Sequence, residues 1–203
     1  ADADKMLNEL IGLADLKEKI KEFKAYITFL NKIKNTDINI PSKNMHMIFT
    51  GNPGTGKTTV ARIIAQMLFD LGIIHENKVI EVEKKDLIAP YVGQTPIKTS
   101  NVIESAMGGV LFIDEAYTLA DSTDRGGYGK EAIATLIKAM EDNKDDLIVI
   151  FAGYKKEMGE FLDINPGITS RIGYIFDFKD YSDRELMEIF ELKVSKANLI
   201  LEN

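Results

Sequence analysis

A glycine-rich stretch with one lysine and one threonine has the spacing of a phosphate-binding loop. Gly51 to Thr58 reads GNPGTGKT and matches the pattern G-x-x-x-x-G-K-[ST]. Glycines let such a backbone curl so that its N–H groups face phosphate oxygens. Lys57 would reach the β- and γ-phosphates of a nucleotide, and the Thr58 hydroxyl would ligate Mg²⁺. The alternative is a plain glycine turn, but ordinary residue usage produces four such fixed positions in only about one chain in a hundred of this length.

Two adjacent carboxylates follow an apolar run further along the chain. Residues 110–113 read VLFI, and Asp114 and Glu115 come directly after them. Beside a phosphate loop, an aspartate at the end of a strand holds Mg²⁺. Glu115 would orient and deprotonate an attacking water. A second carboxylate beyond the metal ligand favours hydrolysis over transfer to a substrate hydroxyl, whereas the structural alternative is an acidic pair that caps a helix.

These groups can meet only if the strands that carry them end side by side. Apolar or alternating runs predict strands at residues 45–50, 78–83, 110–113, 147–152 and 174–178. Apolar residues at helical spacing predict helices at residues 16–30, 58–71, 95–107, 131–141 and 183–196, with loops at 34–43 and 121–129. Buried strands that alternate with helices predict an α/β fold, a parallel sheet covered on both faces, with its ligand at the carboxyl ends of the strands.

The composition excludes several other kinds of site. The 203 residues suffice for one domain, or for one domain and a fragment. The net charge of -7, with no basic stripe, weighs against a nucleic-acid partner, and the lack of cysteine excludes disulfides and thiolate sites. Apolar runs are too short for a membrane span and the N-terminus lacks a secretory signal, so we expect a cytoplasmic protein. His46 and His75 have no partner at metal-ligand spacing and are interpreted as structural or surface residues.

The motifs resemble those of the AAA+ ATPases. GNPGTGKT, LFIDEAY and the later NPGITSRI carry this resemblance. A narrower resemblance rests on HMIFTGNPGTGKTTVAR, YVGQT, AMGGVLFIDEAY and LIVIFAGYK, which look like the branch that contains the red-type Rubisco activases and the stage V sporulation K proteins. It covers about residues 7–192. The abundance of Lys, Ile and Asn favours the sporulation members of the branch.

The resemblance implies a P-loop NTPase fold of the AAA+ type with ATP and Mg²⁺ as cofactors. It implies assembly into a ring, a hexamer when the helical lid is present, that remodels a protein substrate, here in bacterial sporulation. By the same resemblance Leu10, Ile11 and Gly12 contact adenine. The residues that it places around the phosphates are Asn52, Pro53, Gly54, Thr55, Gly56, Lys57, Thr58 and Thr59.

Two further roles come from the resemblance alone. Arg171, in TSRI, stands where the family has an arginine finger that reaches the nucleotide of a neighbouring subunit. A guanidinium there stabilises charge that develops on the γ-phosphate, with an effect of roughly 10³–10⁵ in rate. Tyr91, Val92 and Gly93 stand where the family has a pore loop that grips an unfolded segment, and the neighbouring Pro90 favours a loop.

The chain departs from the family pattern at two places. Tyr154 follows the strand after which many AAA+ proteins have a sensor asparagine; its hydroxyl can still donate one hydrogen bond. We also expect residues 1–180 to form the nucleotide-binding core and residues 181–203 to form only the first part of a truncated helical lid.

Three other functions remain open at this point. A Rubisco-activase-like metabolic ATPase would use the same motifs on a different substrate. A DNA-remodelling ATPase is disfavoured by the acidic charge. A nucleotide switch that binds ATP without hydrolysing it is disfavoured by the intact pair Asp114 and Glu115.

Overall fold

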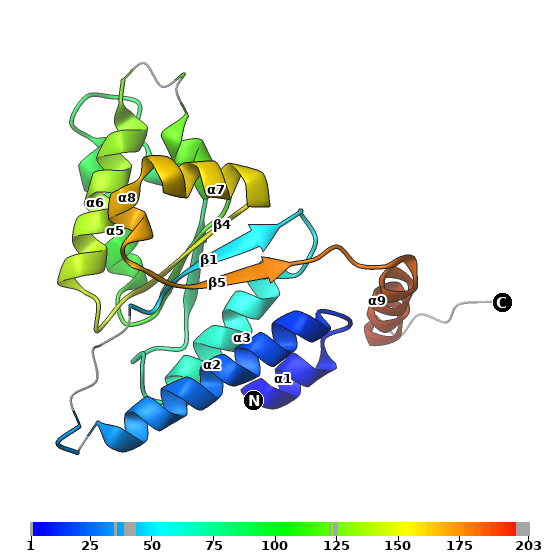
Figure 1. Cartoon of the computed structure of the whole chain (residues 1–203). Coiled ribbons are helices and arrows are strands. Elements are labelled where there is room, and N and C mark those ends of the chain that lie inside the picture. The colour runs from blue at the N-terminus through cyan, green and yellow to red at the C-terminus, as the bar shows by residue number, and fades with distance from the viewer. Residues whose placement is uncertain (1, 35, 39–43, 122, 124–125, 198–203) are drawn as a thin grey trace.

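Five strands form one parallel sheet in the computed structural model, which describes residues 2–34, 36–38, 44–121, 123 and 126–197 (Figure 1). The order across the sheet is β2-β3-β4-β1-β5, and every neighbouring pair is parallel. The bounds are β1 (His46–Gly51), β2 (Val79–Val82), β3 (Val110–Ile113), β4 (Ile148–Gly153) and β5 (Ile172–Phe178). This arrangement confirms the predicted α/β fold.

Helices cover both faces of the sheet (Figure 1). One face carries α1 (Ala3–Glu9), α2 (Ala14–Ile33) and α3 (Lys57–Asp70). The other face carries α4 (Lys84–Leu87), α5 (Thr95–Ala106), the 3₁₀ helix η1 (Ala116–Ala120), α6 (Tyr128–Asp142), α7 (Lys155–Ile164) and α8 (Pro166–Thr169). Within the described residues, no helix is long and apolar enough to cross a membrane.

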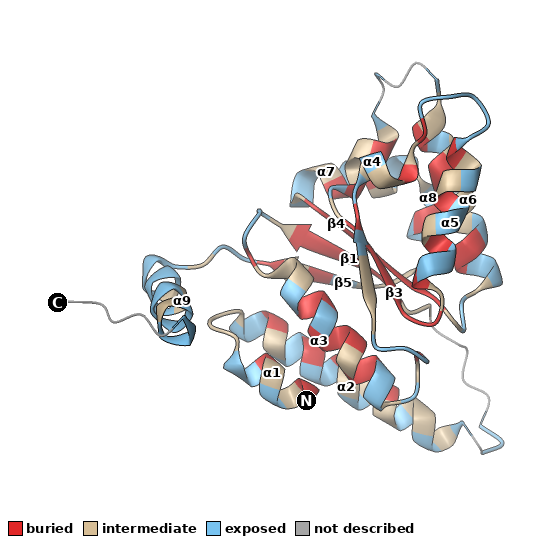
Figure 2. Cartoon of the chain, turned by 180° about the vertical axis from the view of Figure 1, so that it is seen from behind, coloured by how far each residue is buried: buried red, intermediate tan, exposed pale blue. Residues whose placement is uncertain are grey.

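The alternation of side chains along the strands divides the core into two clusters. Met47 and Phe49 of β1 pack with the helices of the first face, whereas Ile48 packs with those of the second. Each strand can be apolar throughout because successive side chains point to opposite faces and both faces are covered. Figure 2 shows the buried residues in the sheet and on the sides of the helices that face it.

The last described helix, α9 (Asp183–Lys196), lies beyond the carboxyl ends of the strands, away from the two core layers (Figure 2). It begins with a reciprocal cap in which the Ser182 hydroxyl accepts from the Glu185 N–H and the Glu185 carboxylate accepts from the Ser182 N–H. No residue of α9 is buried, and Leu186, Met187 and Phe190 are exposed.

The predicted strands and the longer helices are present, with boundaries that shift by a few residues. The prediction of a loop over residues 121–129 was wrong at its end, because α6 begins at Tyr128. Residues 122 and 124–125 of that loop, and residues 35 and 39–43 of the loop predicted at 34–43, lie outside the described residues. The sequence analysis did not predict α1 or α7; α7 follows β4 without an intervening turn, and Met158 and Phe161 are the residues that it buries.

His46 supports the sheet through its imidazole ring. The ring is buried, its Nδ1 accepts from the Val149 N–H at 3.0 Å, and its Nε2 lies 3.3 Å from the Met140 carbonyl oxygen. These bonds require the neutral tautomer with the proton on Nε2. Burial lowers the pKa of His46 below its ordinary value, while the Met140 carbonyl acts in the opposite direction. The structural interpretation of this histidine is confirmed.

We predict that the chain loses stability below pH 6.5, the ordinary pKa of histidine, and that His46→Gln removes this part of the pH dependence. The unfolded state binds a proton at His46 below that pH, whereas the native state binds it only below the lowered pKa. The free energy of unfolding therefore falls by up to about 1.4 kcal/mol per pH unit in this window.

Urea unfolding of wild type and His46→Gln at about pH 7.5 and about pH 5 measures the effect, since denaturant midpoints report stability. His75→Gln is the matched control, because that ring is exposed and pairs with Asp146 at 2.8 Å on the surface. Equal loss of stability in wild type and His46→Gln would contradict the prediction.

Candidate active site

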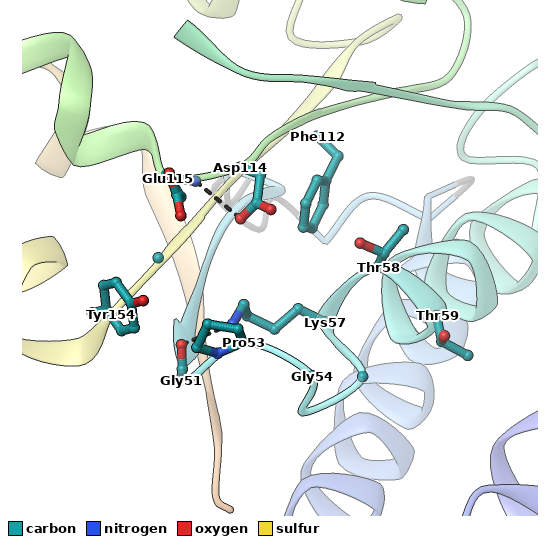
Figure 3. Close-up of a pocket in the computed structure, with 12 residues that line it drawn as sticks. Gly51, Pro53, Gly54, Lys57, Thr58, Thr59, Phe112, Asp114, Glu115 and Tyr154 are labelled. Atoms are coloured by element: carbon teal, nitrogen blue, oxygen red, sulfur yellow. Dashed lines mark hydrogen bonds between the residues drawn. The ribbon is translucent and has the colours of Figure 1, made fainter.

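A pocket of about 290 Å³ opens at the carboxyl ends of the central strands β1, β3 and β4 (Figure 3). In open parallel sheets this is where ligands bind. The pocket brings together the glycine-rich loop, the two carboxylates and the residue that follows β4. Its lining consists of Gly51, Pro53, Gly54, Gly56, Lys57, Thr58, Thr59, Phe112, Asp114, Glu115, Gly153 and Tyr154.

The glycine-rich loop connects β1 to α3. Gly56 has φ +91°, a left-handed conformation that disfavours other residues, and a Cβ there would lie 3.0 Å from the Tyr181 hydroxyl. That hydroxyl donates to the Thr55 carbonyl oxygen at 3.1 Å. The Thr55 side chain is buried and donates to the Asn52 carbonyl oxygen at 2.7 Å, so it supports the loop from within. The loop is thus held in shape on both sides.

Lys57 lies inside the curl of the loop. Its ammonium group donates to the carbonyl oxygens of Gly51 at 2.7 Å and Asn52 at 2.8 Å. Burial lowers the pKa of Lys57, and the charges of Asp114 and Glu115 act in the opposite direction. The two carboxylates therefore favour the charged lysine that phosphate binding needs.

The oxygen atoms suited to a divalent cation come from two elements. Thr58, in the first turn of α3, and Asp114, directly after β3, both line the pocket. The Thr58 hydroxyl donates to Glu81 Oε1 at 3.2 Å, so its proton points away and its lone pairs stay available. Mg²⁺ takes one or two protein oxygens and completes its shell with water and phosphate, so this donor set fits it. A larger group of three or more metal-binding side chains is absent from the described part of the chain.

Glu115 and Tyr154 form the wall of the pocket opposite the loop (Figure 3). The Glu115 backbone has φ +49°, and its N–H donates to Asp114 Oδ1 at 2.9 Å. The centroid of the Tyr154 ring lies 6.0 Å from that of the Tyr117 ring, in a tilted arrangement. Burial raises the pKa of Tyr117, and the charge of Glu115 adds to this effect. The pocket thus has a carboxylate and a phenol on the side that faces Lys57.

A second cavity of about 570 Å³ lies on the other side of the loop, between the first helices and α9. Leu10 and Ile11 line it together with Gly54, Thr59 and Tyr181. Gly12 lies beside this cavity with φ +69°, where a Cβ would overlap the Glu185 carboxylate. The apolar walls and the shared loop residues make this cavity suitable for a flat ring attached to the phosphates.

Arg171 does not belong to this pocket. It precedes β5, at the amino end of the sheet, and seven strand residues of about 3.3 Å each separate it from the carboxyl end. Its Nε donates to Glu141 at 3.1 Å and its Nη1 donates to the Gly167 carbonyl oxygen at 2.8 Å. A rigid strand about 20 Å long thus separates Arg171 from its own chain's phosphate loop.

The tripeptide Tyr91, Val92 and Gly93 lies in the loop between α4 and α5. Tyr91 is 68% exposed and Val92 is 85% exposed. The base of the loop is anchored by buried hydroxyls: Thr95 accepts from the Ala89 N–H at 3.1 Å and Thr99 donates to the Leu87 carbonyl oxygen at 2.9 Å. An anchored base presents the two large side chains to solvent.

The sequence analysis missed several residues that shape the site. Phe112 could have been found, because it lies two positions before Asp114 on the same face of β3. Tyr181 carried no signal, since its partner Thr55 is 126 positions away. Glu81 also carried none, because its contact with Thr58 joins β2 to α3. The Asn52 side chain, expected near phosphate, donates instead to Asp180 at 2.9 Å.

The amino-acid sequence of the chain is similar to those of several bacterial and algal proteins. It is 45% identical to stage V sporulation protein K of Bacillus subtilis over 191 aligned residues, and the alignment covers 93% of this chain and 58% of that protein. It is 46% identical to protein CbbX of Cereibacter sphaeroides, over 89% of this chain and 59% of that protein. It is 43% identical to the chloroplastic ribulose bisphosphate carboxylase/oxygenase activase of Cyanidioschyzon merolae, over 95% of this chain and 66% of that protein. The chain spans about 58 to 66% of the length of these relatives.

The fold is also found in solved structures. The crystal structure of the FIGL-1 AAA domain in complex with ADP superposes with a TM-score of 0.63 at 18% identity, over 93% of this chain and 60% of that chain. Residues 47–179 match the model of the ATPase family associated with various cellular activities (AAA), and this range contains β2 to β5, all of β1 except His46, and every residue that lines the first pocket. The chain therefore belongs to the AAA family, whose members bind nucleotide.

Proposed function

We propose that this chain is the nucleotide-binding part of a ring-forming ATPase that uses ATP hydrolysis to remodel a protein substrate. One observation carries the proposal: a single pocket unites the cation of Lys57, the oxygens of Thr58 and Asp114, and the carboxylate of Glu115. These are the parts that hydrolysis of a phosphoanhydride requires.

The residues divide the reaction between them. Lys57 would exchange its bonds to backbone carbonyls for bonds to the β- and γ-phosphate oxygens. Thr58 and Asp114 would hold Mg²⁺, which neutralises charge on these phosphates. Glu115 accepts a proton from a water that attacks the γ-phosphorus, the bond to the β–γ bridging oxygen breaks, and ADP and phosphate result. Tyr154 donates its hydroxyl proton in a hydrogen bond at the same wall of the pocket.

The remaining roles are proposals about the assembled ring. Arg171 acts in trans, which agrees with its place at the far end of β5. Tyr91, Val92 and Gly93 contact the substrate, which agrees with their exposure. Leu10, Ile11 and Gly12 contact adenine beside the second cavity. We propose residues 1–180 as the core and α9 as the start of a helical lid, in a cytoplasmic protein that forms a hexamer.

Two cellular processes are candidates for this ATPase. The name of the Bacillus subtilis relative supports sporulation, which we prefer. The names and similar identities of the activase and CbbX relatives support a metabolic ATPase that acts on Rubisco. ATP-dependent recovery of inhibitor-bound Rubisco in the presence of this protein would favour the second candidate over the first.

We predict that Lys57→Ala and Glu115→Gln separate binding from hydrolysis. Lys57→Ala should weaken ATP binding about 10- to 100-fold, because it removes charge-assisted hydrogen bonds worth roughly 1.5–3 kcal/mol. Glu115→Gln should bind ATP normally and hydrolyse it about 10²- to 10⁴-fold more slowly, since it removes the base. Fluorescent-nucleotide titration and single-turnover hydrolysis measure the two effects.

The exposed residues Lys32 and Glu104, on α2 and α5, provide the controls Lys32→Ala and Glu104→Gln. Hydrolysis by Glu115→Gln at the wild-type rate would show that Glu115 is not the base. Tight ATP binding without hydrolysis in wild type would instead favour the nucleotide switch.

Arg171→Ala should lower hydrolysis by roughly 10³–10⁵ when the protein is assembled, because the guanidinium stabilises the transition state in the neighbouring subunit. Mixing Arg171→Ala with Lys57→Ala then restores part of the activity. Each mixed interface can combine an intact pocket from the first variant with an intact arginine from the second. Failure of every mixing ratio to restore hydrolysis, with mixed rings present by native mass spectrometry, would exclude a trans role.

Tyr91→Ala should abolish ATP-dependent binding of an unfolded polypeptide, whereas Tyr91→Phe should retain it, because the aromatic ring makes the contact with the polypeptide. Fluorescein-labelled casein serves as the probe. Anisotropy is measured in the Glu115→Gln background, where the ATP-bound state accumulates. Ile97→Ala is the control, since this residue is also exposed and lies on α5 outside the tripeptide. Equal binding by Tyr91→Ala and Tyr91→Phe would argue against a pore contact.

A further inference from the structure

The conformation of the Glu115 backbone is unusual for its residue type. Glu115 has φ +49° and ψ +44°, in the left-handed region, which its Cβ makes unfavourable. Among the described residues other than glycine, only Leu13 and Glu115 have positive φ. A residue in this region persists only where its surroundings hold it there, and such residues cluster at active sites.

Two side chains hold the two peptide groups on either side of Glu115. On the amino side, Asp114 Oδ1 accepts from the Glu115 N–H at 2.9 Å. On the carboxyl side, the Thr118 hydroxyl donates to the Glu115 carbonyl oxygen at 2.6 Å, and the Thr118 N–H donates to the same oxygen at 3.0 Å. The first contact fixes the peptide group before Glu115 relative to the Asp114 side chain, and the second fixes the peptide group after Glu115 to the first turn of η1. The Glu115 backbone thus lies between two anchored peptide groups.

The direction of the Glu115 carboxylate depends on this backbone. Glu115 is exposed, so neighbouring side chains do not enclose it. It lies between the phosphate pocket and an adjacent cavity lined by Glu83, Lys84 and Thr118. A return to an ordinary backbone conformation would turn the Cα–Cβ bond and move the carboxylate away from the place shown in Figure 3, where it faces the pocket beside Asp114.

We propose that Thr118 is a positioning residue for Glu115. Through the Glu115 carbonyl oxygen, its hydroxyl keeps the carboxylate aimed at the water beside the γ-phosphate. This inference rests on the proposed function of Glu115 as the base. The Thr118 side chain is only half-buried, so its replacement by valine opens no cavity and its main effect is the loss of this hydrogen bond.

The test compares Thr118→Val with Thr118→Ser in the full chain. Thr118→Val should slow single-turnover ATP hydrolysis about 10- to 100-fold, the effect of misplacing a reacting group by about 1 Å, while ATP affinity stays as in wild type. Thr118→Ser should restore the rate, because it keeps the hydroxyl. Thr28→Val is the matched control: it removes a hydroxyl that donates to the Lys24 carbonyl oxygen at 2.8 Å in α2, on the other face of the sheet.

A double-mutant cycle separates positioning from general damage. In the Glu115→Gln background, Thr118→Val should cause no further loss, since the base that it positions is gone. Equal loss with and without Glu115, a parallel loss of ATP affinity, or a serine variant as slow as the valine variant would each overturn the proposal.

Backbone NMR gives a readout that does not depend on hydrolysis. The ¹³Cα and ¹³Cβ shifts of Glu115 should indicate the left-handed conformation in wild type and Thr118→Ser, and should change in Thr118→Val. Unchanged shifts in Thr118→Val would overturn the proposal even if Glu115 proves to be the base. Equal hydrolysis by wild type and Glu115→Gln would overturn the role of Glu115 itself, and changed shifts in Thr118→Val would then still show that Thr118 sets its conformation.

Discussion

The parallel hydrogen bonding of β4 to both β1 and β3 is the constraint on which the site depends. Thr50 of β1 is in register with Gly153 of β4, and Ile113 of β3 is in register with Phe151. The loop after β1 and the carboxylates after β3 therefore emerge at one edge of the sheet. They are separated by two inter-strand spacings, about 10 Å, which leaves room for phosphates and a hydrated cation.

The charges of Lys57, Asp114 and Glu115 prepare the pocket for a polyanion. The loop surrounds Lys57 with backbone carbonyls and partly removes it from water, which alone would favour the neutral amine. The carboxylates across the pocket favour the ammonium form. A polyanion that binds in this pocket meets an ammonium group that is already charged and beside the loop, and this group would exchange its hydrogen bonds to the carbonyls for bonds to the phosphates. One of these carboxylates, Asp114, would also hold the cation that accompanies the phosphates.

The pocket lies at one end of the sheet, and Arg171 lies at the other. The groups that would contact a phosphate bound by the same chain lie at the carboxyl ends of the strands, while Arg171 lies at the amino end of β5, where it pairs with Glu141. The exposed loop with Tyr91 projects from the base anchored by Thr95 and Thr99. A protein with parts of one mechanism on separated surfaces is suited to work as several copies, and this is the physical basis for proposing a ring.

The sequence by itself determined the glycine-rich loop, the adjacent carboxylates, the five strands and their parallel arrangement. These features follow from residue types at fixed local spacing, which the 3.6-residue and 2-residue periods encode. Only the tertiary structure decided the contact of Tyr181 with the loop, the buried histidine between two strands, and the distance of Arg171 from its own pocket. Such contacts join residues up to 126 positions apart, and no local period specifies them. The left-handed backbone of Glu115 was also seen only in the structure, although its partners Asp114 and Thr118 are neighbours in the sequence, because no local period of residue types specifies a positive φ.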